Sequence, residues 1–84
     1  MSVHKLEEAG YEVIQYLGEE GKYRGEFPTS ADAKYAMRRL LSSKSTADVV
    51  DYLKALKYVK TSKGRLMLTA KGIQVFNTLA SRSA

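Results

Sequence analysis

A short hairpin pattern between two helical patterns constrains the fold of this chain more than any other feature. Residues 58–62 and 65–68 carry the apolar and β-branched side chains that favour strands. Lys63 and Gly64 lie between them and predict a two-residue turn, because glycine adopts a positive φ without steric cost. An antiparallel pair of strands among helices predicts a mainly helical α+β fold.

Two helix-start signals precede the hairpin. Thr29 is followed three residues later by Asp32, which is the spacing of a capping box. The same spacing recurs at Ser45 and Asp48. Each pair therefore predicts the first turn of a helix.

Apolar residues at helical spacing follow both signals. They predict helices over residues 29–41 and 45–57, joined by a three-residue turn at 42–44. The expected inner faces are Ala33, Ala36, Met37, Leu40 and Leu41 in the first helix, and Val49, Leu53 and Leu56 in the second.

The first helix of the chain is predicted over residues 3–18, where apolar residues recur every three or four positions. Gly18 and Gly21 are expected to end it, and residues 22–27 to form a connector or a short strand. Its apolar surface is wider than one stripe and includes Tyr11, Ile14 and Tyr16.

A last helix is predicted after the hairpin. Thr69 is its expected cap, and Leu68 and Ile73 have the spacing of a hydrophobic staple. Its expected inner stripe is Ile73, Phe76, Leu79 and Ala80.

Length and composition predict one globular domain over residues 1–84, of which 44% are hydrophobic. The chain has no cysteine, and its one histidine is His4. We expect no enzyme, cofactor or metal, because the sequence has no paired carboxylates in a cleft pattern, no Cys/His pair and no phosphate-binding glycine loop. No apolar run has the length of a membrane span, so a cytoplasmic protein without a membrane partner is expected.

The net charge of +5 is unevenly distributed. Residues 1–28 contain three basic and six acidic residues, whereas residues 29–84 contain eleven basic and three acidic residues. A basic face and an acidic back are therefore expected. The basic face favours nucleic acid over a membrane, since the basic residues do not gather on one amphipathic helix.

The predicted order is helix, connector, helix, short turn, helix, hairpin, helix. It resembles the winged helix-turn-helix domains of small bacterial and archaeal transcription regulators, over nearly the whole chain. The segments that carry the resemblance are Phe27-Pro28-Thr29, Ser43-Lys44-Ser45-Thr46, Tyr52-Leu53-Lys54-Ala55-Leu56, Tyr58-Val59 and Leu68-Thr69-Ala70-Lys71-Gly72. The resemblance implies a three-helix core, a two- or three-stranded β wing, a C-terminal helix, and binding of double-stranded DNA.

In such domains the third helix enters the major groove and the wing reaches a phosphate or the minor groove. By this resemblance, helix 45–57 would enter the groove and hairpin 58–68 would contact phosphates. The candidate DNA-binding residues are Lys34 and Arg38 in the second helix, Lys44, Ser45, Thr46, Ala47, Asp51 and Lys54 at the third, and Lys60, Lys63 and Arg65 in the hairpin.

The third helix has few side chains that read bases. It contains no Arg, Asn or Gln, which make the most specific contacts to base edges. Thr46 and Ala47 suit a thymine methyl group, and Asp51 can accept from cytosine but repels phosphates. The hairpin is therefore expected to act as a phosphate clamp that strengthens binding.

A protein-interaction module of the same fold is the alternative, because fold alone does not fix function. The acidic first helix and its extra apolar surface would suit a protein partner. A homodimer through the first or the last helix is also expected, because one domain offers one recognition helix and regulators pair half-sites.

Overall fold

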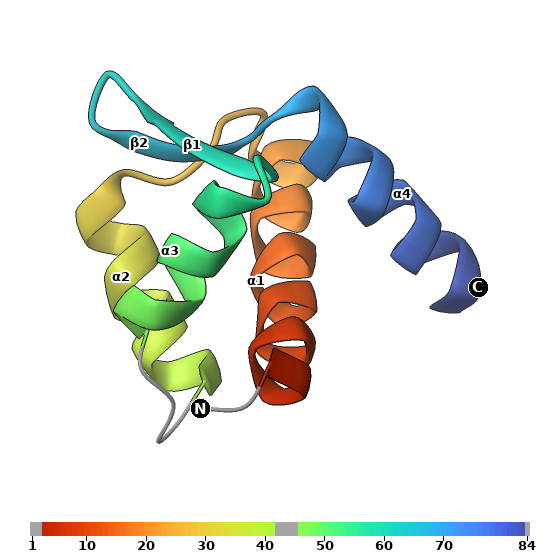
Figure 1. The fold of residues 1–84 in the computed structure, drawn as a ribbon. Helices are drawn as coiled ribbons and strands as arrows, with labels where there is room; N and C mark the ends of the chain where they lie inside the picture. Colours follow the sequence, from red (N-terminus) through yellow and green to blue (C-terminus); the bar gives the residue numbers. More distant parts are fainter. Residues whose placement is uncertain (1–2, 42–45, 84) are drawn as a thin grey trace.

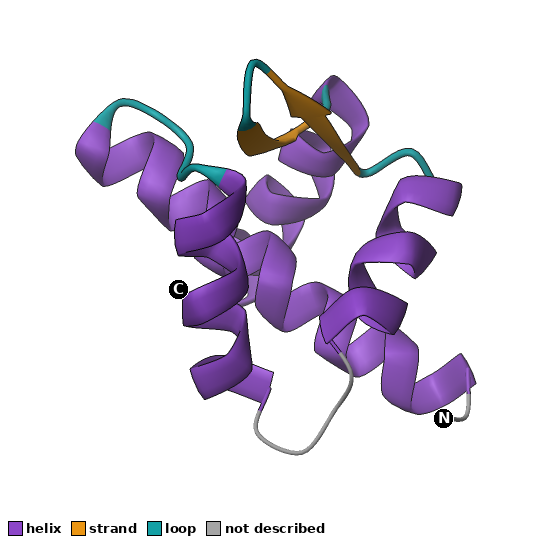
Figure 2. Ribbon diagram, turned by 90° about the vertical axis from the view of Figure 1, so that its left-hand side faces the viewer, coloured by secondary structure: helices purple, strands orange, loops and turns teal. Residues whose placement is uncertain are grey.

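The structure, a computed structural model, describes residues 3–41 and 46–83. Its elements are helix α1 (Val3–Arg24), helix α2 (Ser30–Leu41), helix α3 (Thr46–Ala55), strands β1 (Val59–Ser62) and β2 (Arg65–Leu68), and helix α4 (Ala70–Ser83). The expected mainly helical α+β fold is confirmed. Helix α1 packs against α2, α3, α4 and β2, and the hairpin lies across one end of the helices (Figures 1 and 2).

The core lies between α1 and the other elements. Its buried side chains come from α1, α2, α3 and the inner face of the hairpin, and they are Ala9, Val13, Ile14, Leu17, Ala33, Met37, Leu41, Val49, Leu53, Val59, Leu66 and Leu68. Burial of these apolar side chains is the main favourable term for the fold.

Two of the three predicted helix caps lie in the described residues, and both are confirmed. The backbone N–H of Asp32 donates to Oγ1 of Thr29 at 3.2 Å. The backbone N–H of Gly72 donates to Oγ1 of Thr69 at 3.1 Å. The third predicted cap, Ser45, and the turn at 42–44 lie outside the described residues.

Helix α3 is shorter than the predicted range of 45–57 and ends at Ala55. Lys57 has a left-handed φ of 65°. The backbone N–H of Tyr58 donates to the carbonyl of Leu53 at 3.0 Å, and that of Lys57 donates to the carbonyl of Lys54 at 3.0 Å. These two bonds form a Schellman motif, which ends the helix and turns the chain into β1.

Helix α1 corrects two sequence predictions. It continues through Gly18 and Gly21 to Arg24, so neither glycine ends it and the expected connector begins only after Arg24. A Cβ at Gly18 would overlap the ring of Phe76, and a Cβ at Gly21 would lie 2.9 Å from Cε1 of Phe27. Both glycines therefore allow aromatic rings to pack directly on the helix backbone.

Four apolar side chains lie on faces other than those predicted. Leu40 of α2 and Ile73 and Ala80 of α4 were expected inside, but Leu40 and Ile73 are 44% and 42% exposed and Ala80 is exposed as well. Ile14 was expected to widen the outer surface of α1, but it is fully buried. The side of α4 that meets the core carries Val75, Phe76 and Leu79, which rotates Ile73 toward solvent.

The hairpin has the predicted two-residue turn. Strand pairing runs from Val59 opposite Leu68 to Ser62 opposite Arg65. Lys63 and Gly64 have φ values of 51° and 75°, and two positive values are typical of a type I′ turn. One further antiparallel bridge joins Thr29 to Arg65. The segment before α2 therefore adds one residue pair at the edge of β2.

Replacing Gly18 with alanine tests its packing role. In an open helix this change stabilises a protein by about 1 kcal/mol. Here the new methyl group meets the ring of Phe76, so we expect a loss of about 1–3 kcal/mol in the free energy of unfolding. Urea denaturation measures it, with Glu19→Ala on the exposed side of α1 as the control. A Gly18→Ala protein as stable as the parent would contradict this role.

Candidate functional site

A groove of about 350 Å³ lies where α2, α3 and the hairpin meet. We call it the α2–α3–hairpin groove. Helix α2 lines it with Ser30, Lys34 and Met37, helix α3 with Thr46, Ala47, Val50, Asp51 and Lys54, and the hairpin with Thr61 and Leu66.

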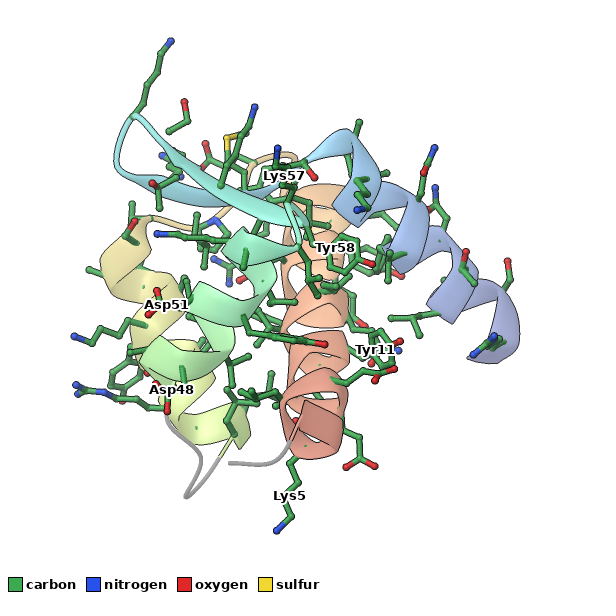
Figure 3. The ribbon with its side chains drawn as sticks, in the orientation of Figure 1. Lys5, Tyr11, Asp48, Asp51, Lys57 and Tyr58 are labelled. Carbon is green, nitrogen blue, oxygen red and sulfur yellow. The ribbon has the colours of Figure 1, made fainter. Side chains whose placement is uncertain are left out.

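Five of the predicted DNA-binding residues line this groove. They come from the consecutive helices α2 and α3, and they are Lys34, Thr46, Ala47, Asp51 and Lys54. Figure 3 shows Asp48 and Asp51 along α3, and Asp51 is the acidic residue among those that line the groove. The fold therefore brings these five residues together as one surface.

The other predicted residues lie outside the groove or outside the described chain. Arg38 is exposed one turn beyond Lys34 on α2, and Lys63 is exposed at the turn of the hairpin. Lys60 pairs with Met67 on the outer face of the hairpin, because strand residues alternate and Thr61 faces the groove. Lys44 and Ser45 lie outside the described residues.

Arg65 has a structural role that its sequence position does not reveal. Its Nη1 donates to the carbonyl oxygen of Phe27 at 2.6 Å, and its Nη2 lies 3.6 Å from Oε2 of Glu26. Two backbone bonds accompany it, from the Ser30 N–H to the Gly64 carbonyl and from the Leu66 N–H to the Pro28 carbonyl. The guanidinium therefore ties the hairpin to the segment that leads into α2.

Groove residues missed by sequence reasoning are Ser30, Met37, Val50, Thr61 and Leu66. Val50 lies four residues before Lys54, so helical spacing alone places it on the same side of α3. Thr61 and Leu66 form a directly opposed pair in the hairpin. Their place beside α3 depends on how the hairpin docks, which no local pattern encodes.

The chemistry of the groove combines apolar groups with two ammonium groups and one carboxylate. Lys34 on α2 and Lys54 on α3 supply the ammonium groups, Asp51 supplies the carboxylate, and all three are exposed. Thr46, Ala47 and Val50 supply methyl groups. Such a surface can attract a polyanion and contact apolar groups on it, such as the methyl of thymine.

The acidic side of the molecule is the first part of α1. Glu7, Glu8 and Glu12 are exposed there. The hydroxyl of Tyr11 donates to Oε1 of Glu7 at 2.9 Å, and this hydrogen bond is the main reason that the pKa of Tyr11 is raised. Because Ile14 is buried, the extra apolar surface expected on this helix is smaller than the sequence suggested.

A second tyrosine of α1, Tyr16, is half-buried and packs against the core cluster. Burial raises the pKa of Tyr16, and the nearby carboxylates of Glu20 and Asp32 raise it further. Tyr16 therefore contributes to the packing of the fold.

Among residues 3–41 and 46–83, no three His, Cys, Asp or Glu side chains are arranged to hold a metal ion. None of the helices described there has the length and apolar character needed to cross a bilayer.

No protein-family model, curated protein or solved structure matches this chain.

Replacing Arg65 with alanine tests its structural role. A hydrogen bond from a charged donor is worth about 1.5–3 kcal/mol, and partial exposure reduces this, so we expect a loss of about 1–2 kcal/mol in the free energy of unfolding. Lys60→Gln is the control on the same hairpin, and it should change stability by less than about 0.5 kcal/mol. Thermal or urea unfolding measures the stability of both variants. Equal losses of stability would contradict the structural role of Arg65.

Proposed function

We propose that this chain is a winged helix-turn-helix protein that binds double-stranded DNA and regulates transcription. Helix α3 would enter the major groove, and the β1–β2 hairpin would serve as the wing. The order of helices and hairpin supports the proposal, as does the single bridge between Thr29 and Arg65, which adds a third chain segment to the hairpin. A regulator of a bacterium or an archaeon would act in the cytoplasm, where the DNA lies.

The observation that carries the proposal is the composition of the α2–α3–hairpin groove. Two lysines from separate helices line it together with small and methyl-bearing side chains of α3. A major groove about 12 Å wide admits one helix and leaves its neighbours close to the phosphates on either side. Lys34 on α2 and Lys54 at the C-terminal end of α3 would reach these phosphates, and Lys63 would extend the basic surface at the hairpin turn.

The contacts divide into two kinds. Lys34, Lys54 and Lys63 would bind phosphates, which fixes position without reading sequence. Thr46 and Ala47 would contact base edges. Asp51 would accept a hydrogen bond from cytosine, and its repulsion of nearby phosphates would lower the affinity for DNA. Arg65 would hold the wing in position through its hydrogen bond to Phe27 and its ion pair with Glu26, and would not itself bind a DNA phosphate.

The alternative function is a protein-interaction module. One observation favours it: exposed acidic side chains gather on the first part of α1, beside the partly exposed Tyr11. A basic protein partner would fit that side. This alternative function predicts that a protein partner binds independently of the α2–α3–hairpin groove.

Binding to random duplex DNA at several salt concentrations separates the two functions. If several lysines bind phosphates, the logarithm of the association constant should fall by about 0.9 per contact for each tenfold rise in salt. Fluorescence anisotropy between about 50 and 200 mM salt measures this slope. Absence of binding to duplex DNA at the lowest salt would exclude the DNA function and leave the protein-interaction module.

A charge-matched pair of double variants maps the contacts. Lys54→Gln with Lys63→Asn should weaken binding to all sequences and reduce the salt slope by up to about two. Asparagine tolerates the left-handed φ at position 63. The control, Arg24→Gln with Arg82→Gln, removes two exposed cations from α1 and α4. If both double variants lose DNA affinity equally, only net charge matters. That result would contradict DNA binding through the α2–α3–hairpin groove.

A further inference from the structure

A small pocket of about 260 Å³ lies between α1, α3 and the turn that leads into the hairpin. We call it the tyrosine pocket, because each of these three segments contributes one tyrosine to its lining. Tyr11 comes from α1, Tyr52 from α3 and Tyr58 from the turn before β1. In Figure 3, Tyr58 lies above Tyr11 beside α1. Three aromatic rings from separate segments therefore surround one small space.

Contacts outside the pocket hold each ring in place. Tyr52 and Tyr58 are half-buried and pack against the core. The carbonyl of Tyr58 accepts from the Thr69 N–H at 3.0 Å and from the Thr69 hydroxyl at 3.2 Å. Tyr11 is held by the bond that its hydroxyl donates to Glu7. The pocket is therefore formed before a ligand arrives, which lowers the cost of binding.

One ring of the pocket already binds a cation within the chain. Nζ of Lys71 lies 5.1 Å from the centroid of the Tyr58 ring. The face of an aromatic ring carries negative electrostatic potential, which attracts a cation at this distance. Lys71 does not line the tyrosine pocket, so its ammonium group leaves the space between the three rings open.

Glu7 supplies the charge of the pocket. Among the residues that line it, Glu7 is the charged one, and its side chain is exposed. Its Oε1 accepts from the Tyr11 hydroxyl, and a carboxylate has further acceptor sites. Besides Glu7, the phenol groups of Tyr52 and Tyr58 contribute to the raised pKa of Tyr11, in keeping with three hydroxyls close together. A carboxylate beside three rings favours a positively charged ligand.

Size and chemistry narrow the class of that ligand. The pocket is smaller than the roughly 300–1,000 Å³ of sites for drug-sized molecules. A bare metal ion needs several oxygen ligands, and the described part of the chain gathers no three acidic, His or Cys side chains for one. A neutral apolar ligand would leave the Glu7 carboxylate without a counter-charge. A quaternary ammonium spreads its charge over methyl groups, which suits aromatic rings and a carboxylate together.

We propose that the tyrosine pocket binds a small quaternary ammonium compound, with its methyl groups against Tyr11, Tyr52 and Tyr58 and its charge beside Glu7. The proposal does not depend on DNA binding, because the pocket shares no lining residue with the α2–α3–hairpin groove.

Titration of the isotope-labelled protein with choline chloride at constant ionic strength, followed by NMR, tests the pocket. The amide signals of residues 7, 11, 52 and 58 should shift and saturate with a dissociation constant of about 1–10 mM. The neutral carbon analogue, 3,3-dimethyl-1-butanol, should bind at least about tenfold more weakly, because it has the same shape without the charge. Absence of saturable shifts up to about 100 mM choline, or equal affinity for the neutral analogue, would overturn the proposal.

A third probe separates a free quaternary ammonium from the lysine side chain of a protein partner. Butylammonium represents the end of a lysine side chain, and its primary ammonium group is strongly hydrated. It should therefore bind more weakly than choline. Tighter binding of butylammonium than of choline would contradict a quaternary ammonium site.

Paired variants place the binding in this pocket. Tyr52→Leu removes a ring but keeps an apolar side chain, and Glu7→Gln removes the charge from an exposed position. Each should weaken choline binding about fivefold or more. The matched controls are Tyr23→Leu and Glu12→Gln, exposed positions of α1 that do not line the pocket, and both should stay within about twofold of the parent.

Circular dichroism verifies that all four variants fold. If the two pocket variants bind choline as tightly as their controls, the cation binds elsewhere and the proposal is wrong. None of these measurements involves DNA, so failure of the tyrosine pocket leaves the DNA-binding proposal unaffected.

Discussion

The docking of the hairpin onto the segment before α2 is the interaction on which the candidate site depends. The core joins the hairpin to the helices, because Val59, Leu66 and Leu68 are buried in the same cluster as Val49 and Leu53 of α3. The Arg65 guanidinium on the Phe27 carbonyl and the backbone bonds of Ser30 and Leu66 then tie the hairpin to the segment before α2. Together these contacts place Thr61 and Leu66 on the third side of the groove.

Features set by neighbouring residues could be predicted from the sequence. The caps at Thr29 and Thr69 and the turn at Lys63-Gly64 depend on local geometry, and they form as expected. The five groove residues on α2 and α3 were chosen by the resemblance to winged helix-turn-helix domains, applied to the predicted helices, and Lys63 was placed at the turn by the local hairpin pattern.

Features set by distant residues could not be predicted. Gly18 looks like a helix terminator until Phe76, on another helix, is seen to occupy the space beside it. Arg65 looks like one more hairpin cation until its partners, 38 and 39 residues earlier in the chain, are known. Ile73 was assigned to the core because α4 can turn either of two adjacent faces inward, and packing against α1 selects the face with Phe76 and Leu79.

Titration of the isotope-labelled protein with a short DNA duplex, followed by amide NMR spectra at low salt, tests the central claim most directly. The account predicts that the amide signals of Lys34, of residues 46–54 and of Lys63 shift with added DNA, while those of residues 7–12 on α1 do not. Shifts confined to residues 7–12, or no shifts at a protein concentration well above the expected dissociation constant, would contradict it.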